Sequence, residues 1–511
     1  MDRDTHWNIG ARSAAACTWL VQTNVSADLP QVTTLAMVAA VAVAIALSWS
    51  WPIGQDAPLM QYCAFLMDHG KVPYRDVVDM NSFGAYFSSW LEIHALGYSD
   101  LGWRVYDLLF LALGASGIWM IARSFGKLEV VLASCMLAIF HIQEGPLELG
   151  QRDFQFAILA LVGCGLVCEG MRHCSGLLLF ASGVIFSAGS TIKLSGILFV
   201  PVFFLLIIAF DWRRHSLGWS ARLAVLIGSV IPWGGVFLYL HHVGGLTPFL
   251  AMSAKFLPLY SKMGRVSATE LLSRACANLE SLAFPALVSI LLLPGTSWKY
   301  RRFECAVIAC GAATGFISYA AQGKGWWYQL DPLAAFLCLW CGISVAGLLA
   351  KPNFKIGAAA SLVPFLLLAI TPVFATTRPD YAKLPQPSDL EADLRVLREF
   401  GKDRGIQVMD TAAGGIHALY DLKLVQSTDF LYDFYFFQYP ENPFIQGLRT
   451  RFLAQLNAAR PDLIVIATDS WPDPSMKASR IDRWPDLRDF LRANYTQNSQ
   501  TYWYRIYVRN Q

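Results

Sequence analysis

The sequence predicts a mainly α-helical protein, a polytopic membrane bundle of about 11 spans followed by a small C-terminal α/β domain. The first observation is composition: 55% of the 511 residues are hydrophobic and 15% are charged, whereas soluble proteins carry about 25% charged residues. The second is a series of long apolar runs within 32–375, and the third is a polar tail at 376–511. Residues 1–31 are then a cytoplasmic N-terminal segment.

Each expected span is an apolar run that can cross roughly 30 Å of hydrocarbon as a helix. The runs lie at 32–51, 101–122, 128–142, 154–169, 176–192, 194–210, 222–241, 281–297, 303–321, 332–350 and 356–375. The first run lacks a small-residue cleavage motif, so we expect it to stay as an anchor. An odd number of spans places the two chain ends on opposite sides of the membrane.

Basic residues in the short loops orient the bundle. They occupy alternate loops, as Arg123 and Lys127, Arg172, Arg213, Arg214 and Arg222, Lys299, Arg301 and Arg302, and Lys351 and Lys355. Because cytoplasmic loops are enriched in lysine and arginine, we expect the amino terminus in the cytoplasm. Loops 52–100, 143–153, 242–280 and 322–331 and the tail then lie outside.

The first outer loop, 52–100, is patterned rather than irregular. Residues 58–69 and 83–96 repeat apolar side chains at helical spacing. We expect both segments to be amphipathic helices in the membrane interface, with aromatic side chains at headgroup level. The charged stretch between them, from Lys71 to Asp76, is expected to be extended.

The tail alternates helical and strand patterns. Helices are expected at 388–403, 444–459 and 485–495, and strands at 406–409, 463–467 and 502–508, the last as an edge strand. Helices between strands are typical of an α/β domain with a partly parallel sheet.

Carboxylates of the first outer loop are the candidate catalytic groups. Asp56 directly follows the first span, where a general base would act at the membrane surface. A helix cap or a solvated loop charge is the alternative interpretation. Asp76 and Asp79 lie beside Tyr74 and Arg75, and simple ion pairing also explains this group.

Three basic residues stand at the outer ends of later spans. Arg152 begins the span at 154–169, and pairing with a neighbouring carboxylate or with a headgroup phosphate explains it. Lys193 interrupts an apolar stretch, which indicates function unless its side chain reaches the interface. Lys324 lies in a short hairpin rich in tryptophan, where aromatic anchoring is the alternative.

Loop 242–280 interleaves Lys255, Lys262 and Arg265 with apolar residues. This mixture suits a lipid phosphate whose tail lies in the bilayer, and it equally suits a plain interfacial helix. A sugar leaving on a carrier-lipid phosphate needs cations, and the attacking hydroxyl or amine needs a base. Acidic residues in one outer loop and basic residues in the others describe one such site.

Four segments carry a resemblance to a known superfamily. They are Gln55-Asp56-Ala-Pro, Gly70-Lys-Val-Pro-Tyr-Arg-Asp-Val-Val-Asp, Thr191-Ile-Lys-Leu-Ser-Gly and Gly323-Lys-Gly-Trp-Trp-Tyr-Gln-Leu-Asp-Pro. With these motifs and its topology, the whole chain resembles the GT-C superfamily of polyprenyl-phosphate-dependent glycosyltransferases. It is similar to the bacterial relatives of protein O-mannosyltransferases and of the lipid A aminoarabinose transferase. The resemblance implies a bacterial inner membrane protein whose C-terminal domain is periplasmic.

The resemblance also implies roles. Asp56 maps to the catalytic base or acceptor-orienting residue, and Asp76 and Asp79 map loosely to further polar contacts. Lys193 and Lys324, with Arg152 behind them, map to the residues that hold the donor phosphate. The implied reaction is an inverting transfer of one sugar from a polyprenyl-phosphate donor to a glycan, glycolipid or protein acceptor.

The chain departs from the superfamily pattern at two places. Ala57 stands where many relatives have a second acidic residue, and Asn81-Ser82-Phe83 replaces a usual Pro-Pro pair. These departures leave open the acceptor and whether a divalent metal joins Asp56. No cofactor is required by this interpretation.

Two other functional classes compete. A transporter or flippase for a lipid-linked saccharide would use the same cations without a base, but we find no internal repeat of the kind such proteins carry. A scaffold or sensor would concentrate its charge in the tail, whereas this chain also concentrates it in the first outer loop. The net charge of +3 reflects loop topology, so we expect membrane lipids and no nucleic acid among the partners.

Overall fold

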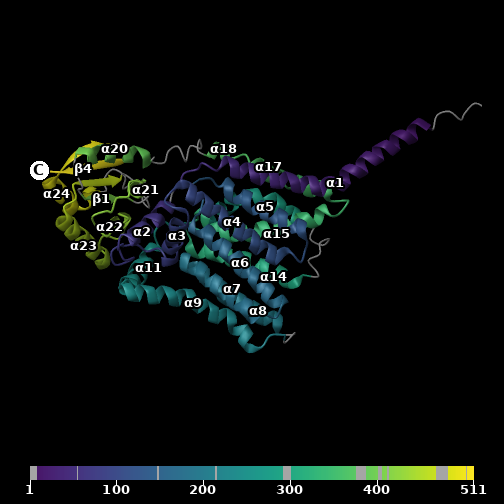
Figure 1. Ribbon diagram of the computed structural model, residues 1–511, viewed down its shortest axis with the longest axis horizontal. Coiled ribbons are helices and arrows are strands. Elements are labelled where there is room, and N and C mark those ends of the chain that lie inside the picture. Colours follow the sequence, from purple (N-terminus) through teal and green to yellow (C-terminus); the bar gives the residue numbers. More distant parts are fainter. Residues whose placement is uncertain are drawn as a thin grey trace, which may run out of the picture.

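The computed structural model describes residues 9–54, 56–146, 149–212, 216–291, 301–375, 387–400, 405–410, 414–467, 481–501 and 503–510. A bundle of long helices carries the C-terminal domain at one end, and α1 (Ile9–Leu47) projects from the other (Figure 1). We call these the domain end and the far end.

The helices of the bundle follow the expected spans. After α1 they are α4 (Asp100–Ala122), α5 (Lys127–Gln143), α6 (Arg152–Arg172), α7 (Gly176–Ile192), α8 (Phe199–Asp211), α9 (Trp219–Val243), α13 (Glu280–Leu291), α14 (Arg302–Gln322), α15 (Asp331–Leu349), α16 (Lys355–Ala360), α17 (Val363–Leu368) and α18 (Pro372–Ala375). Shorter helices α10 (Leu246–Ala251), α11 (Leu257–Tyr260) and α12 (Ala268–Asn278) connect α9 to α13.

Eight helical stretches of the described chain are long and apolar enough to cross a membrane, which makes it an integral membrane protein. The expected spans at 128–142, 176–192 and 281–297 correspond to α5, α7 and α13, whose 17, 17 and 12 residues are shorter. A span usually needs about 20 residues. Residues 292–297 of the expected span at 281–297 lie outside the described residues.

Small residues bring the helices of the bundle close together. A Cβ atom at Gly183 of α7 would lie 2.0 Å from the carbonyl oxygen of Val225 in α9, and one at Gly228 would lie 2.1 Å from that of Phe180. The two backbones therefore touch, which is the close packing that small residues permit in membrane proteins.

The two helices expected in loop 52–100 are present as α2 (Ala57–Asp68) and α3 (Phe83–Leu96). Phe87 and Leu91 of α3 are exposed, as expected for an interfacial helix. By contrast, α2 is buried from Ala57 to Leu66 because it packs between α3 and the C-terminal domain. The sequence predicts an amphipathic helix in the membrane interface here, whereas the part of α2 from Ala57 to Leu66 is covered by protein.

The C-terminal domain is the expected α/β unit. Its sheet has the order β1-β2-β4-β3, with β1 parallel to β2 and the other pairs antiparallel. The strands are β1 (Ile406–Met409), β2 (Leu463–Ala467), β3 (Tyr495–Gln500) and β4 (Tyr504–Arg509), and the helices are α20 (Pro387–Phe400), α21 (Gly415–Asp421), α22 (Phe434–Phe437), α23 (Pro443–Ala459) and α24 (Pro485–Asn494). The strand expected at the sheet edge is β4, and it is interior because β3, which the sequence analysis missed, pairs with its outer side.

The C-terminal domain is joined to loop 52–100 by hydrogen bonds. The Val78 amide donates to the Asp429 carbonyl at 2.6 Å. The Tyr62 hydroxyl donates to the Leu424 carbonyl at 2.9 Å and accepts from the Gln426 amide at 3.0 Å. Buried residues of the loop and the domain form one continuous hydrophobic core, so the two parts form one body.

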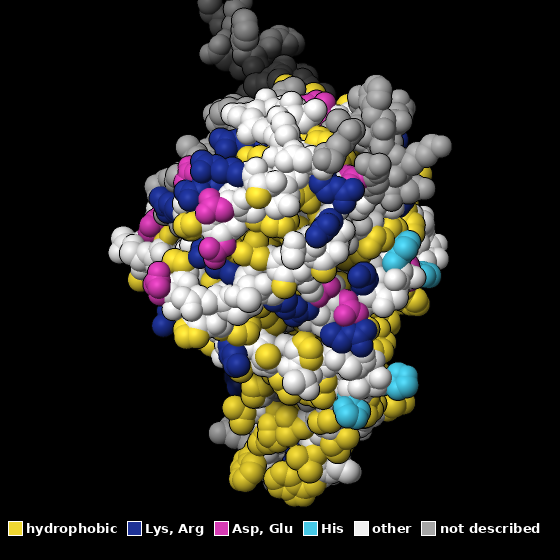
Figure 2. All heavy atoms as spheres, turned by 90° about the vertical axis from the view of Figure 1, so that its left-hand side faces the viewer, with side chains coloured by type: hydrophobic (Ala, Val, Ile, Leu, Met, Phe, Trp, Pro, Cys, Tyr) yellow, Lys and Arg dark blue, Asp and Glu magenta, His cyan; other side chains and the backbone are white. Residues whose placement is uncertain are grey.

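The surface has a part rich in charged side chains and a part rich in hydrophobic ones. Charged side chains gather on the face of the C-terminal domain, and hydrophobic side chains cover the flank below it (Figure 2). On α9 the exposed hydrophobic residues include Ile227, Val230 and Leu238. Such an uncovered apolar flank is what the hydrocarbon of a bilayer would face.

Candidate active site

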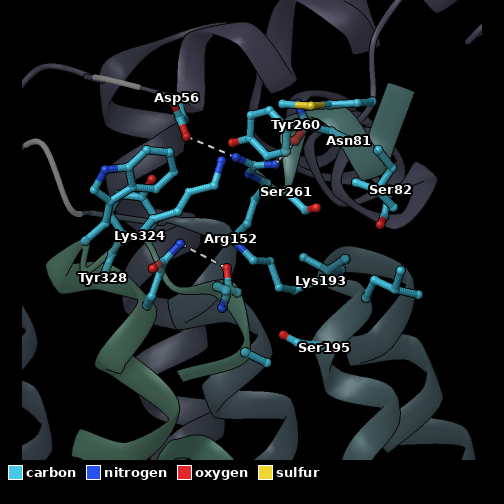
Figure 3. Close-up of a pocket in the computed structure, with 18 of the residues that line it drawn as sticks. Asp56, Asn81, Ser82, Arg152, Lys193, Ser195, Tyr260, Ser261, Lys324 and Tyr328 are labelled. Carbon is cyan, nitrogen blue, oxygen red and sulfur yellow. Dashed lines mark hydrogen bonds and ion pairs between the residues drawn. The ribbon is translucent and has the colours of Figure 1, made fainter. Parts of the chain in front are cut away.

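A cavity of about 530 Å³ lies at the domain end of the bundle. Its wall combines Asp56 at the start of α2, Arg152 at the start of α6, Lys193 after α7 and Lys324 after α14. Tyr432 and Phe434 of the C-terminal domain also line it. Asp56 enters from one side of the cavity, and Lys193 and Ser195 lie on the opposite side (Figure 3).

Asp56 and Arg152 form an ion pair in the cavity wall. The Arg152 Nη2 donates to Asp56 Oδ2 at 3.0 Å, and the side chains are 13% and 30% exposed, respectively. The Arg152 Nη1 donates to the Asn81 side-chain oxygen. The carboxylate is thus oriented and remains accessible from the cavity, as a general base must be.

Lys193 is placed by the end of a helix. It has extended backbone angles, φ −135° and ψ 112°, between α7 and the 3₁₀-helix Leu194–Leu198. Its ammonium bonds Asp153 at 2.7 Å and lies 5.9 Å from the centre of the Tyr328 ring. A lysine at this depth is tolerated because a carboxylate partner offsets its loss of water.

Lys324 is the most enclosed of the cavity cations. Gly323 and Gly325 on either side have φ +65° and +69°, so the chain turns sharply and aims the lysine inward. Its ammonium lies 3.2 Å from the centre of the Tyr260 ring and 4.9 Å from that of Trp326. Burial, and then the nearby Lys193, lower the pKa of Lys324 to about 7.

The charges of the cavity wall are unbalanced. Its charged residues in the described chain are the carboxylate Asp56 and the cations Arg152, Lys193 and Lys324. Asp153 lies behind the wall and neutralises Lys193. Among the described lining residues, three cations therefore face one carboxylate, which favours an anionic ligand such as a phosphate.

Tyr74, Arg75, Asp76 and Asp79 do not line the cavity. Asp76 pairs with Arg75 at 2.7 Å on the surface, which lowers the pKa of the Asp76 carboxyl. Asp79 is fully buried and accepts hydrogen bonds from four donors, among them the hydroxyls of Tyr86 at 2.5 Å and Tyr435 at 2.9 Å. The structure brings this group to the junction with the C-terminal domain.

The basic residues of loop 242–280 also lie outside the cavity wall. The Lys255 ammonium is 5.8 Å from the centre of the Phe444 ring in α23, and Lys262 is exposed. Arg265 lies against Gly323, where an added Cβ would be 2.8 Å from its Nε. The segment contributes Leu257, Tyr260 and Ser261 to the wall instead.

Several lining residues were missed by the sequence analysis. Asn81 was interpreted as a departure from a family pattern, and Tyr260 as one of the apolar residues of a loop that suits either a lipid phosphate or a plain interfacial helix. Tyr432 and Phe434 belong to the aromatic run from Phe430 to Phe437, which has no strand or helix period. That run could have pointed to these residues, because so many aromatic residues in a polar domain indicate a buried contact surface.

No group of three or more metal-ligating side chains is placed to hold an ion within the described residues. The divalent metal that the sequence analysis left open beside Asp56 therefore has no ready-made ligand set in that part of the chain. The Asp56 side chain is paired with Arg152 instead.

The fold and the cavity together define an integral membrane protein with a cationic cavity at the domain end. Its fold is similar to that of ArnT from Cupriavidus metallidurans bound to undecaprenyl phosphate, with a TM-score of 0.65, 12% identity, and 93% of this chain and 97% of that chain covered. ArnT in the apo state gives 0.59 and 10%, with 97% and 98% covered.

The archaeal oligosaccharyltransferase AglB from Archaeoglobus fulgidus, in complex with an inhibitory peptide and a dolichol-phosphate, gives a TM-score of 0.50 and 13% identity, with 94% of this chain and 74% of that chain covered. No protein-family model and no curated protein matches the sequence. At such identities the likeness concerns the fold alone, and it confirms the expected architecture of a polytopic helical membrane bundle with a small C-terminal α/β domain.

Proposed function

We propose that the protein is a glycosyltransferase that moves one sugar from a polyprenyl-phosphate-linked donor to an acceptor, with inversion at the sugar carbon. One observation carries the proposal: a carboxylate and three cations share one cavity at the end of a membrane bundle. A base and a phosphate-holding group are the two requirements of this chemistry. The solved structures with bound undecaprenyl phosphate and dolichol-phosphate support the donor class.

In the proposed step, Asp56 acts as the general base. The acceptor hydroxyl or amine attacks the anomeric carbon from the face opposite the phosphate while Asp56 takes its proton. The bond between that carbon and the phosphate oxygen breaks, and polyprenyl phosphate leaves with the bonding electrons. Arg152, Lys193 and Lys324 stabilise the negative charge that grows on the leaving phosphate.

Lys324 suits the leaving phosphate because its charge responds to the ligand. Burial lowers its pKa to about 7 in the free protein. A negative phosphate beside it would raise that pKa again, so donor binding favours the charged lysine. Lys324 is then protonated when negative charge develops on the leaving phosphate.

The lipid part of the donor has a path to the bilayer. Leu194 and Trp327 line the cavity and are also 48% and 42% exposed. An apolar rim between a charged cavity and the surface would let a polyprenyl chain extend into the membrane while its phosphate stays inside. Membrane lipids and a glycan, glycolipid or protein acceptor are the proposed partners.

The alternate basic loops support the proposed orientation, with the amino terminus in the cytoplasm and the cavity and C-terminal domain on the outer, periplasmic side of a bacterial inner membrane. Transfer would then occur outside the cytoplasm.

The test is transfer from a panel of radiolabelled polyprenyl-phosphate sugars by the purified full-length protein. Wild type should transfer one of them, and Asp56→Asn should lose about 10²–10⁴-fold in kcat while it still binds the donor. Glu270→Gln, which removes an exposed carboxylate paired with Arg274 at 2.5 Å, is the matched control and should keep full activity.

Donor binding without turnover in both wild type and Asp56→Asn, with candidate acceptors present, would contradict the proposal. It would favour a transporter or flippase for lipid-linked saccharides, which uses the same cations and needs no base.

A further inference from the structure

Asn81 is held by both its main chain and its side chain. Its carbonyl oxygen accepts from the hydroxyls of Tyr74 at 2.7 Å and Tyr86 at 3.4 Å. Its side-chain nitrogen donates to Asp79 Oδ2 at 2.8 Å. Because an ionised carboxylate only accepts, this bond directs the side-chain oxygen of Asn81 toward Arg152, whose Nη1 donates to it.

Asp79 in turn is anchored to the C-terminal domain. It is fully buried, and the Tyr435 hydroxyl of α22 donates to its Oδ1 at 2.9 Å. Burial, and then the adjacent Asp79, raise the pKa of Tyr435 well above its usual value, so the hydroxyl keeps its proton and remains a donor. A buried carboxylate without such donors would be strongly destabilised.

Arg152 depends on this anchoring for its orientation. Of its three side-chain nitrogens, Nη1 bonds Asn81 and Nη2 bonds Asp56 at 3.0 Å. Its Nε is buried and has no hydrogen-bond partner among the described residues. Loss of the Asn81 contact would leave Asp56 as the one hydrogen-bond acceptor of the guanidinium among the described residues.

The same neighbourhood contains backbone strain. Tyr74 has φ +68°, a region that a residue with a large side chain rarely adopts. Its amide donates to the Val77 carbonyl at 2.9 Å, and its buried ring brings the hydroxyl under Asn81. Strain that the surrounding structure maintains is common where a side chain must be placed accurately.

We propose that Asn81 is a positioning residue for the Arg152–Asp56 pair, and that Asp79 and Tyr435 hold it in place. Docking of the C-terminal domain then fixes the base and one phosphate-binding cation through a chain of four contacts, from Tyr435 to Asp79, Asn81, Arg152 and Asp56. The kinetic consequence rests on the proposed function. Asp79 and Tyr435 lie outside the cavity wall, so they act through Asn81 and not on the substrate.

The test begins with Tyr435→Phe in the full-length protein, which removes one hydroxyl and keeps the ring. We expect kcat to fall about tenfold, the loss of one hydrogen bond to a charged group. The Kd for undecaprenyl phosphate should rise about threefold, because Arg152 also holds phosphate. The larger effect on kcat than on Kd is the mark of a misplaced base, since a general loss of binding would change Kd alone.

Tyr62→Phe is the matched control. It removes a hydroxyl at the same junction, one whose hydrogen bonds in the described part of the chain go to the main chain at Leu424 and Gln426 and not to Asp79, Asn81 or Arg152. It should leave kcat and Kd unchanged. An equal loss in Tyr62→Phe would show that general docking matters, and it would overturn the positioning role.

A double-mutant cycle with Asn81→Ala separates this proposal from the proposed function. If Tyr435 acts through Asn81, the effect of Tyr435→Phe should disappear in the Asn81→Ala background, whereas additive losses overturn the proposal. A wild type that transfers no sugar would reject the proposed function alone. The cycle is then read from the Kd of undecaprenyl phosphate, with the same two outcomes.

Discussion

Helix α6 carries a charged cluster at each end, and the two clusters differ in whether their charges are balanced by neighbouring residues. At the far end, Glu169 pairs with Arg123, and Arg172 pairs with Glu169 at 2.8 Å and with Glu304 at 2.9 Å. Arg172 also donates to the carbonyls of Met120 and Ile121. The charges of the two arginines and the two glutamates cancel, and the guanidinium group of Arg172 donates to acceptors within the protein.

At the domain end, Arg152 and Asp153 of the same helix bond Asp56 and Lys193, and the cations outnumber the carboxylates at a cavity. The comparison shows that buried ion pairs alone do not mark a site. A wall richer in cations than in carboxylates beside open volume does, because only there can an anionic ligand enter and bind.

The largest expected difference is between the two arginines of α6. Arg152→Met should reduce kcat/KM about 10²–10³-fold, because one cation at the leaving phosphate is lost. Arg172→Met should keep kcat but lower the free energy of unfolding by about 3 kcal/mol, since Glu304 loses its arginine and Glu169 keeps only Arg123 of its two. Assays of sugar transfer and of thermal unfolding on both variants measure the two effects. Equal losses of activity would show that the two ends of α6 do not differ in function.

The next effect is expected at Lys324, the most enclosed cation of the cavity wall. Lys324→Met should weaken donor binding about 30-fold, because a methionine of similar length keeps the packing against Tyr260 but carries no charge. Equilibrium binding of the donor to wild type and variant measures the change. Unaltered affinity would place the phosphate elsewhere in the cavity.

The charge of Lys324 also predicts a pH dependence. Its pKa is lowered to about 7, so the free protein holds a charged lysine below pH 7 and loses that charge as the pH rises. Affinity for a donor phosphodiester, which keeps its negative charge throughout this range, should therefore fall by up to about tenfold per pH unit above 7. Lys324→Arg should give a flat profile, since arginine stays protonated. A wild-type profile that is equally flat would contradict the assignment.

The smallest effect is expected at Lys193, because Asp153 already neutralises it. Lys193→Gln should weaken donor binding about fivefold and destabilise the protein, since a buried carboxylate is left without its cation. Adding Asp153→Asn should restore the unfolding temperature but leave the donor affinity low. Recovery of affinity as well would show that Lys193 serves structure alone.

The sequence predicted the parts of the site that local rules determine. Asp56, Arg152, Lys193 and Lys324 each interrupt or border apolar sequence at the end of a span. Helix ends on one side of a membrane must meet at one face, so their convergence followed from topology. The lengths of the shorter helices and the number of complete spans did not follow, because hydropathy does not locate helix ends.

The remaining parts depend on contacts between distant segments. The burial of α2, the interior place of β4 and the use of Tyr432, Phe434 and Tyr435 all arise from docking of the C-terminal domain on loop 52–100. Local periodicity carries no information about such docking, because the same aromatic run could cover any apolar surface.

The joint between loop 52–100 and the C-terminal domain has a consequence for biosynthesis. The Tyr62 hydroxyl and the Gln426 amide, which bond each other, are 364 positions apart in the chain. Asp56 is therefore made well before the cavity wall at Tyr432 and Phe434. Until that wall is made the nascent chain has no complete cavity, so a chain released before that point would lack the aromatic part of the wall.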